Sequence, residues 1–264
     1  MKKFLLTLLA TSLLFTGCSS VTKAGVVCSD RNQFMLVSSE AMEQSSAQAY
    51  VKTLTAARSK GELNVDPILT KRVQDIAKRL IAQTGVFRDD ALKWKWQVNV
   101  INEDTLNAWC MPGGRIVVYS GIIKRLNLTD AQLAAVMGHE IAHALREHSR
   151  EQASADQMKS IGIFAIATAT GLGDLGANAL NLASEYTISL PFSRSHETEA
   201  DHIGTELMAR AGYDPKEAVE VWVKMSKMSG GKVPEILSTH PSNESRIKDL
   251  KEIAAKLEPV YQAA

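Results

Sequence analysis

Apolar residues recur at helical spacing along much of this chain. Between residues 67 and 83 they fall three and four positions apart, which places them on one face of an amphipathic helix. Stripes of this kind usually pack into a protein core, so the pattern indicates buried helix faces rather than binding surfaces. Comparable patterns predict helices over residues 33–57, 67–83, 215–228 and 248–257.

Two shorter segments have the residue types of β-strands. Residues 95–101 alternate in part between apolar and polar side chains, and residues 116–119 are β-branched or aromatic. The second segment follows a Pro-Gly-Gly turn signal at 112–114. We therefore expect a small β-sheet ahead of the central helix, in an α+β fold that is predominantly α.

A helix with a buried face is predicted to begin near residue 129. Thr129 can cap its first turn, and Gln132 stands where a capping box needs an amide or a carboxylate. The apolar residues that follow recur at helical spacing through residue 144. Polar side chains on such a buried helix need partners, and a bound metal would satisfy several at once.

This helix carries the sequence His-Glu-Ile-Ala-His at 139–143. His139 and His143 are four residues apart, so both imidazoles lie on one helix face and can reach one ion. Glu140 lies near the same side, where it can serve as a general base toward a water molecule. The motif therefore predicts a catalytic zinc site, which normally takes a third protein ligand. The alternative is a surface helix with incidental histidines.

The third ligand is expected in a second predicted helix around residues 193–209. Glu197 and Asp201 share one face of that helix, so Glu197 can bind the metal while Asp201 fixes the tautomer of a histidine ligand. His196 and Glu199 are the rival ligands, although they project elsewhere on the helix.

Four blocks in order resemble one known family. They are the stretch 107–121, the H-E-x-x-H motif, the segment 194–201 with its E-x-x-x-D spacing, and the stretch 239–247. This combination resembles the zinc metallopeptidases related to the CAAX prenyl endopeptidase and HtpX, and most closely their periplasmic lipoprotein members. The resemblance implies a zincin-like, gluzincin-type domain, one Zn²⁺ per chain, and Glu197 as the third zinc ligand.

The resemblance also assigns roles outside the two helices. It implies that Asn107, Ala108, Trp109, Cys110 and Met111 face the substrate, and an edge strand there could pair with an extended peptide by main-chain hydrogen bonds. A purely structural hairpin is the alternative reading of this stretch.

His240 and Arg246 lie in the last of the four blocks. The resemblance places His240 near the metal, either as a hydrogen-bond donor to the oxyanion or as a zinc ligand that blocks water in a resting state. Arg246 is expected to pair with a carboxylate near the site, with an ordinary surface ion pair as the alternative.

The N-terminus has the features of a bacterial lipoprotein. A basic start and a short apolar run predict a signal peptide over residues 1–17, with lipidation of Cys18 as the new N-terminus. The mature chain, 18–264, would be one metallopeptidase domain that includes an arm and a helix at 18–60. The expected location is the outer membrane, lipid-anchored and facing the periplasm. The alternative is an ordinary secretion signal.

Two further cysteines, Cys28 and Cys110, would then remain in an oxidising compartment. They are expected to form a disulfide, with two buried thiols as the alternative. The apolar segment 161–172 is too short to span a membrane and is expected to form a helical hairpin over the site, or else an interfacial helix. The formal net charge of +1 gives no support for nucleic-acid binding.

We expect a zinc endopeptidase that cleaves unfolded or misassembled envelope proteins. The alternative is a chaperone-like assembly factor for the outer membrane whose protease is latent. An intact Glu140 favours the enzyme, because a pure binding module has no need of a general base.

Overall fold

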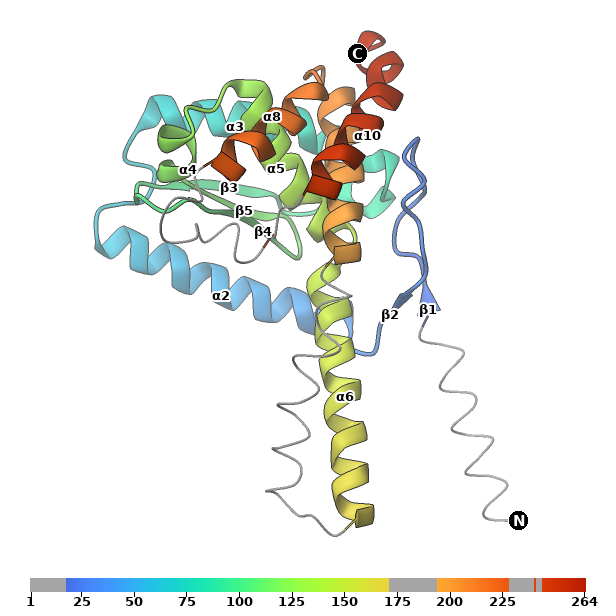
Figure 1. Ribbon diagram of the computed structural model, residues 1–264. Helices are drawn as coiled ribbons and strands as arrows, with labels where there is room; N and C mark the ends of the chain where they lie inside the picture. The colour runs from blue at the N-terminus through green and yellow to red at the C-terminus, as the bar shows by residue number, and fades with distance from the viewer. Residues whose placement is uncertain (1–17, 171–193, 228–239, 241–243) are drawn as a thin grey trace.

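A three-stranded sheet and the helices on its two faces build the domain (Figure 1). The fold is that of a computed structural model, which describes residues 18–170, 194–227, 240 and 244–264. The predicted signal peptide at 1–17 lies outside the described residues. The predominantly helical α+β fold expected from the sequence is confirmed.

The sheet has the strand order β3–β5–β4. β5 (Arg115–Tyr119) lies in the centre, parallel to β3 (Gln97–Ile101) and antiparallel to β4 (Ala108–Met111). The hairpin is therefore β4–β5, and its turn requires the left-handed backbone that Gly113 and Gly114 adopt, with φ values of 82° and 84°. In the strand order β3–β5–β4, β4 is an edge strand of the sheet.

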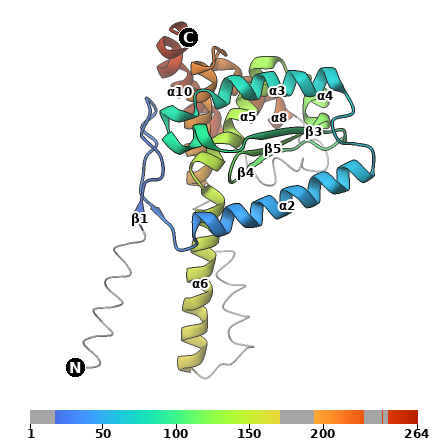
Figure 2. The ribbon, with the colours of Figure 1, turned by 180° about the vertical axis from the view of Figure 1, so that it is seen from behind.

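Different helices cover the two faces of the sheet (Figure 2). α2 (Ser39–Ser59) covers one face, where Tyr50 packs with Ile101 and Val117. The other face packs against α3 (Pro67–Ile81) and α5 (Asp130–Leu145). The alternation of side chains along the strands thus divides the apolar residues between two clusters.

α5 is the central helix of the larger cluster, and nearly all of its residues are buried. Its start matches the sequence prediction, because the Thr129 and Gln132 side chains form the expected capping box. A further helix over residues 194–210 lies close to it. The remaining helices of the described chain are α4 (Ser120–Arg125), α6 (His148–Thr170), α8 (Lys216–Lys227), α10 (Glu244–Gln262) and the short 3₁₀ turns η1 (Thr84–Val86) and η2 (Asp89–Lys93).

The N-terminal arm, residues 18–38, precedes α2. Its two short strands, β1 (Cys18–Ser19) and β2 (Gln33–Phe34), pair antiparallel. The helix predicted from residue 33 begins only at Ser39, because Gln33 is held in β2 and Ser38 caps the helix. Between the strands, the backbone amides of Val26 and Val27 donate to Glu206 Oε2 at 2.8 and 3.0 Å.

The predicted disulfide between Cys28 and Cys110 is wrong for this structure, in which both thiols are free. Cys28 is exposed on the arm, directly after Val27, whose amide donates to Glu206. Cys110 is buried in β4, among the residues that pack toward α3 and α5. Each cysteine is thus held by a different set of contacts.

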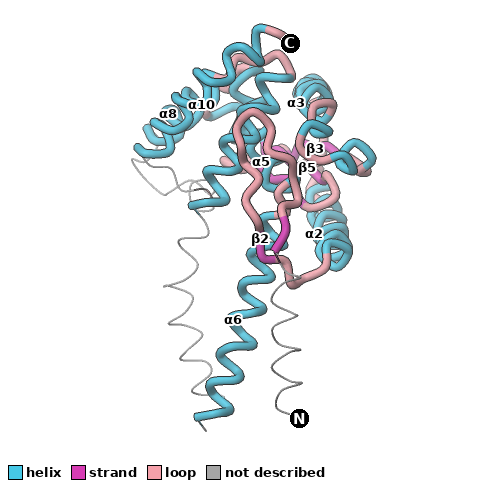
Figure 3. Tube along the Cα trace, turned by 90° about the vertical axis from the view of Figure 1, so that its right-hand side faces the viewer, coloured by secondary structure: helices cyan, strands magenta, loops and turns pink. Residues whose placement is uncertain are grey.

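α6 extends away from the body of the domain (Figure 3). Ile161 and Phe164 on this extension are 53% and 71% exposed. Residues 161–170 thus continue α6 away from the body of the domain and do not pack over the site as expected, whereas the remainder of the predicted hairpin lies outside the described residues. Within the described ranges, no helix is both long and apolar enough to cross a membrane.

Candidate metal centre

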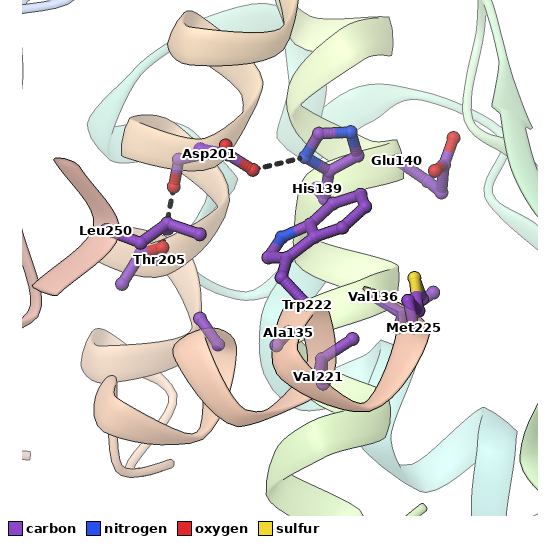
Figure 4. A pocket seen from close by; sticks show the side chains of 11 residues that line it. Ala135, Val136, His139, Glu140, Asp201, Thr205, Val221, Trp222, Met225 and Leu250 are labelled. Carbon is purple, nitrogen blue, oxygen red and sulfur yellow. Dashed lines mark hydrogen bonds and ion pairs between the residues drawn. The ribbon is translucent and has the colours of Figure 1, made fainter. Parts of the chain in front are cut away.

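The two motif histidines on α5 direct one ring nitrogen each to a common point. His139 Nε2 and His143 Nε2 lie 3.1 Å apart. His139 is held in this orientation by Asp201, whose Oδ1 lies 3.0 Å from His139 Nδ1 (Figure 4). Because Asp201 accepts at Nδ1, the opposite nitrogen of that ring is left to face a metal.

Glu197 reaches the same point from the helix over residues 194–210. Its Oε2 lies 3.4 Å from His139 Nε2, and its Oε1 lies 3.3 Å from His143 Nε2. The rival carboxylate Glu199 points elsewhere and bonds Arg146 and His148. Of the two acids, the structure thus brings only Glu197 to the motif histidines.

His240 completes a group of four side chains. Its Nδ1 lies 2.8 Å from Glu197 Oε1 and 3.3 Å from His139 Nε2. One candidate ligand atom from each of His139, His143, Glu197 and His240 lies within 4.8 Å of the others. Three imidazoles and a carboxylate at such spacing fit a single transition-metal ion, and zinc in particular accepts this donor set.

Arg246 is buried beneath the ligand group. Its Nη1 forms an ion pair with Glu197 Oε2 at 2.8 Å, and its Nη2 donates a hydrogen bond to Asp201 Oδ1 at 2.8 Å. The guanidinium also stacks 3.7 Å from the centre of the Trp222 ring, which stands beside His139 in Figure 4. The surface ion pair considered for Arg246 is therefore excluded, and this cation instead holds two carboxylates of the centre in place.

Charge and burial set opposite protonation states on the two motif histidines. Burial lowers the pKa of His139, but the hydrogen bonds with Asp201 and Glu197 outweigh it and raise that pKa to about 9. Burial lowers the pKa of His143 to about 3 and keeps its ring neutral. The carboxylates therefore favour a positive charge between the rings, the position that a divalent cation would take.

Glu140 is buried beside the ligand group. Burial raises the pKa of its carboxyl group above the ordinary value. Its Oε1 has no hydrogen-bond partner among the described residues, and His240 Nε2 lies 3.6 Å from it. An unpartnered buried carboxylate oxygen of this kind is suited to accept a proton from a reactant.

A cleft of about 470 Å³ lies over the centre. Trp109, Cys110 and Met111 of β4 line one part of it, together with Glu140. The predicted substrate-facing stretch is thus brought to the cleft only in part, because Ala108 is packed into the core and Asn107 is not a lining residue. A second cavity behind His139, far smaller, is the pocket drawn in Figure 4.

Sequence reasoning missed a buried polar network next to the ligands. Its members come from three stretches of the chain and are joined through the carboxylates of Glu199 and Glu151. The sequence had indicated His196 and Glu199 only as rival zinc ligands, and the local signal for the others was a third histidine five residues after the motif. The members of the network are Arg31, Gln33, Arg146, His148, Glu151, His196 and Glu199.

Three curated relatives show what the chain is similar to. It is 34% identical to "Mitochondrial metalloendopeptidase OMA1" of Schizosaccharomyces pombe, over 86% of this chain and 65% of that protein. Identity to the protein of the same name in Saccharomyces cerevisiae is 30%, over 95% of this chain and 75% of that protein. Identity to "Beta-barrel assembly-enhancing protease" of Escherichia coli K12 is 30%, over 80% of this chain and 43% of that protein. The chain thus spans less than two thirds of the length of two of these relatives.

These relatives correct the predicted location. The matches that extend over 86% and 95% of the chain are to mitochondrial metalloendopeptidases, not to lipid-anchored proteins of an outer membrane. The expected outer-membrane location is therefore wrong. Lipidation of Cys18 is tested by none of these observations and stays a sequence prediction.

The sequence profile of peptidase family M48 matches residues 67–254. This range holds the sheet, α5 and the helix that carries Glu197. It covers well over half of the chain, and the relatives agree with it because all three are named as proteases or endopeptidases. The chain therefore belongs to peptidase family M48, a family of metallopeptidases.

Proposed function

We propose that the protein is a zinc-dependent endopeptidase that cleaves unfolded or misassembled protein chains. One observation carries the proposal: His139, His143 and Glu197 converge on one point, and the buried Glu140 carboxylate lies in the same cleft. Two imidazoles and a carboxylate are a common ligand set for a catalytic zinc ion.

Each residue then has a chemical task. The bound zinc ion would polarise the substrate carbonyl and lower the pKa of a water molecule at the site. Glu140 takes the proton of that water through its unpartnered Oε1 and passes it to the nitrogen of the leaving amine. Asp201 and Arg246 hold His139 and Glu197 in place during the reaction.

The substrate class follows from the position of β4. β4 is an edge strand of the sheet, and three of its residues line the cleft beside Glu140. A peptide that pairs with β4 would use main-chain hydrogen bonds, which accept many sequences but require an extended chain. Segments of unfolded or misassembled proteins meet this requirement, whereas compact folded proteins do not.

The position of His240 supports a second candidate, an assembly factor whose protease is latent. His240 Nδ1 lies 2.8 Å from Glu197, inside the ligand group. With His240 as a fourth protein ligand, a tetrahedral ion would have no open position for water. An assembly factor of this kind would not need Glu140, which gives a direct way to separate the two candidates.

The test is the substitution Glu140→Gln in the full-length chain. An amide cannot accept the proton of water, so we expect cleavage of unfolded casein to fall to background while the protein still folds and binds zinc. Glu220→Gln, at an exposed position of α8, is the matched control and should cleave like the unmodified chain. Cleavage by purified Glu140→Gln at the rate of the control would refute the proposal.

A further inference from the structure

The second motif histidine has a partner that the first does not have. His139 is held by a carboxylate, whereas His143 Nδ1 lies 2.8 Å from Nδ1 of another imidazole, that of His148. His148 is the first residue of α6 and is 3% exposed. Its opposite nitrogen, Nε2, lies 3.1 Å from Glu199 Oε2. His143, His148 and Glu199 thus form a chain of hydrogen bonds.

The protons in this chain of hydrogen bonds can be placed in only one way if His143 binds a metal. His143 Nε2 must then present its lone pair, so the proton of the neutral ring is on Nδ1 and is donated to His148 Nδ1. His148 is consequently protonated at Nε2, from which it donates to the Glu199 carboxylate. Each bond has one donor and one acceptor, so the chain is internally consistent.

Two guanidinium groups hold the far end of this hydrogen-bond chain, the side chain of Glu199. Arg146 donates from Nε to Glu199 Oε2 at 2.8 Å, and Arg31 donates to Glu199 Oε1. Arg146 is completely buried. Two guanidinium groups thus fix the Glu199 side chain, with Oε2 directed at His148 Nε2.

The ring of His148 is also held against rotation. His196 stacks on it with ring centroids 4.3 Å apart and an angle of 13° between the planes. His196 itself bonds Glu151 Oε2 at 3.1 Å. The stacking holds the plane of the His148 ring, and the contacts at its two nitrogens orient Nδ1 toward the second motif histidine.

We propose that His148 is a positioning residue that fixes the tautomer and orientation of His143 for zinc, with Glu199 as the final acceptor. This inference rests on the proposed function, because it takes His143 to be a zinc ligand. In its role His148 corresponds to Asp201, which does the same for His139. Partners of this kind typically change metal affinity ten- to a hundredfold when they are removed.

Two substitutions at His148 give opposite results for a positioning role and a packing role. His148→Leu fills the space but offers no acceptor, whereas His148→Asn places a carbonyl oxygen near the position of Nδ1. We expect the zinc affinity of the full-length chain, measured by competition with a chromophoric chelator, to fall ten- to a hundredfold for His148→Leu. His148→Asn should retain an affinity within a few fold of the unmodified chain.

His202→Leu is the matched control. His202 lies on the helix that carries Glu197, and its ring bonds Asp249 rather than any member of the chain from His143 to Glu199. The variant His202→Leu should leave the zinc affinity unchanged. Equal affinities for His148→Leu and His148→Asn, whether both normal or both weakened, would overturn the proposed role of His148.

The variant His143→Ala separates this inference from the proposed function. If it binds zinc as tightly as the unmodified chain, the proposed zinc site itself is wrong. If it loses zinc while His148→Leu does not, the site stands and only the role of His148 fails.

A measurement on the unmodified protein avoids any question of folding. Nitrogen-15 NMR of the zinc-loaded chain reports which nitrogen of each imidazole carries the proton. We expect His143 to be protonated at Nδ1 and His148 at Nε2. Protonation of His148 at Nδ1 would reverse the hydrogen bond and refute the inference.

Discussion

Gly138 and Gly204 bring α5 and the helix over residues 194–210 into backbone contact. A Cβ atom on Gly138 would lie 2.7 Å from the carbonyl oxygen of Gly204, and one on Gly204 would lie 2.6 Å from the amide nitrogen of His139. Any larger residue at either position must push the helices apart. These two helices carry His139 and Glu197, so their contact sets the distance between the candidate ligands.

The substitution Gly204→Ala should therefore weaken both the fold and the metal site. Overpacking of a core contact costs about 1–3 kcal/mol of unfolding free energy, and separation of the helices should also lower zinc affinity. Urea unfolding and chelator competition measure the two effects. Gly162→Ala in helix α6 is the control, because its added Cβ meets no atom of the described residues within 4 Å. Equal stability of the two variants would contradict the backbone contact.

Removal of the carboxylate ligand should abolish stoichiometric metal binding. We expect the unmodified chain to hold about one zinc ion and Glu197→Ala to hold far less, because the substitution removes the one carboxylate of the four-residue ligand group and with it the negative charge that balances the ion. Glu199→Gln should still fill with zinc at saturating concentrations, since Glu199 lies outside the ligand group. Elemental analysis after dialysis measures both. The assignment of Glu197 fails if the two variants behave in the reverse order.

His240→Ala should increase the rate of peptide cleavage. His240 Nδ1 lies 2.8 Å from Glu197 Oε1, so this ring occupies space that water needs at the centre. Its removal opens one position while the other three candidate ligands remain. The measurement is kcat on a fluorogenic peptide at saturating zinc. A fall of about 10²–10³ in kcat, with zinc retained, would instead identify His240 as a donor to the oxyanion.

Acid should destabilise the protein through Glu151. Burial raises the pKa of this carboxyl group, but hydrogen bonds from His196 and Arg31 outweigh it and bring the pKa down to about 2. Because the folded-state pKa is depressed, this stabilisation is complete above the ordinary pKa near 4.5 and is lost as the pH falls toward 2.

The variant Glu151→Gln tests this dependence. At neutral pH it should lose on the order of 2 kcal/mol of unfolding free energy, and its stability should change less between pH 5 and pH 3 than that of the unmodified chain. Urea unfolding across this range is the measurement, and Glu252→Gln, an exposed acid on α10, controls for the loss of one charge. Parallel curves for Glu151→Gln and the unmodified chain would rule the explanation out.

Local patterns predicted the parts of this fold that local interactions determine. The start of α5 could be read from Thr129 and Gln132, because a capping box involves only four consecutive residues. The helix from residue 67 likewise begins at a proline after the capping residue Asp66. In both cases the side chains that decide the boundary lie within one turn of it.

Long-range pairing could not be predicted in the same way. The parallel partnership of β3 and β5 depends on how the chain crosses between them, and β4 has only four residues, too few for a clear alternation. The contact between Arg31 and Glu199 joins residues 168 positions apart. The predicted disulfide failed for a related reason, since the spacing of two cysteines says nothing of where the fold places them.

Arg31 has a further consequence for the boundaries of the domain. It lies in the N-terminal arm, upstream of residue 67 where the family profile begins to match, yet it binds both Glu151 and Glu199. A fragment trimmed to residues 67–254 would keep these two buried acids and lose one of their cations. The N-terminal arm therefore supplies part of the charge balance inside this domain, although the family profile begins to match only after it.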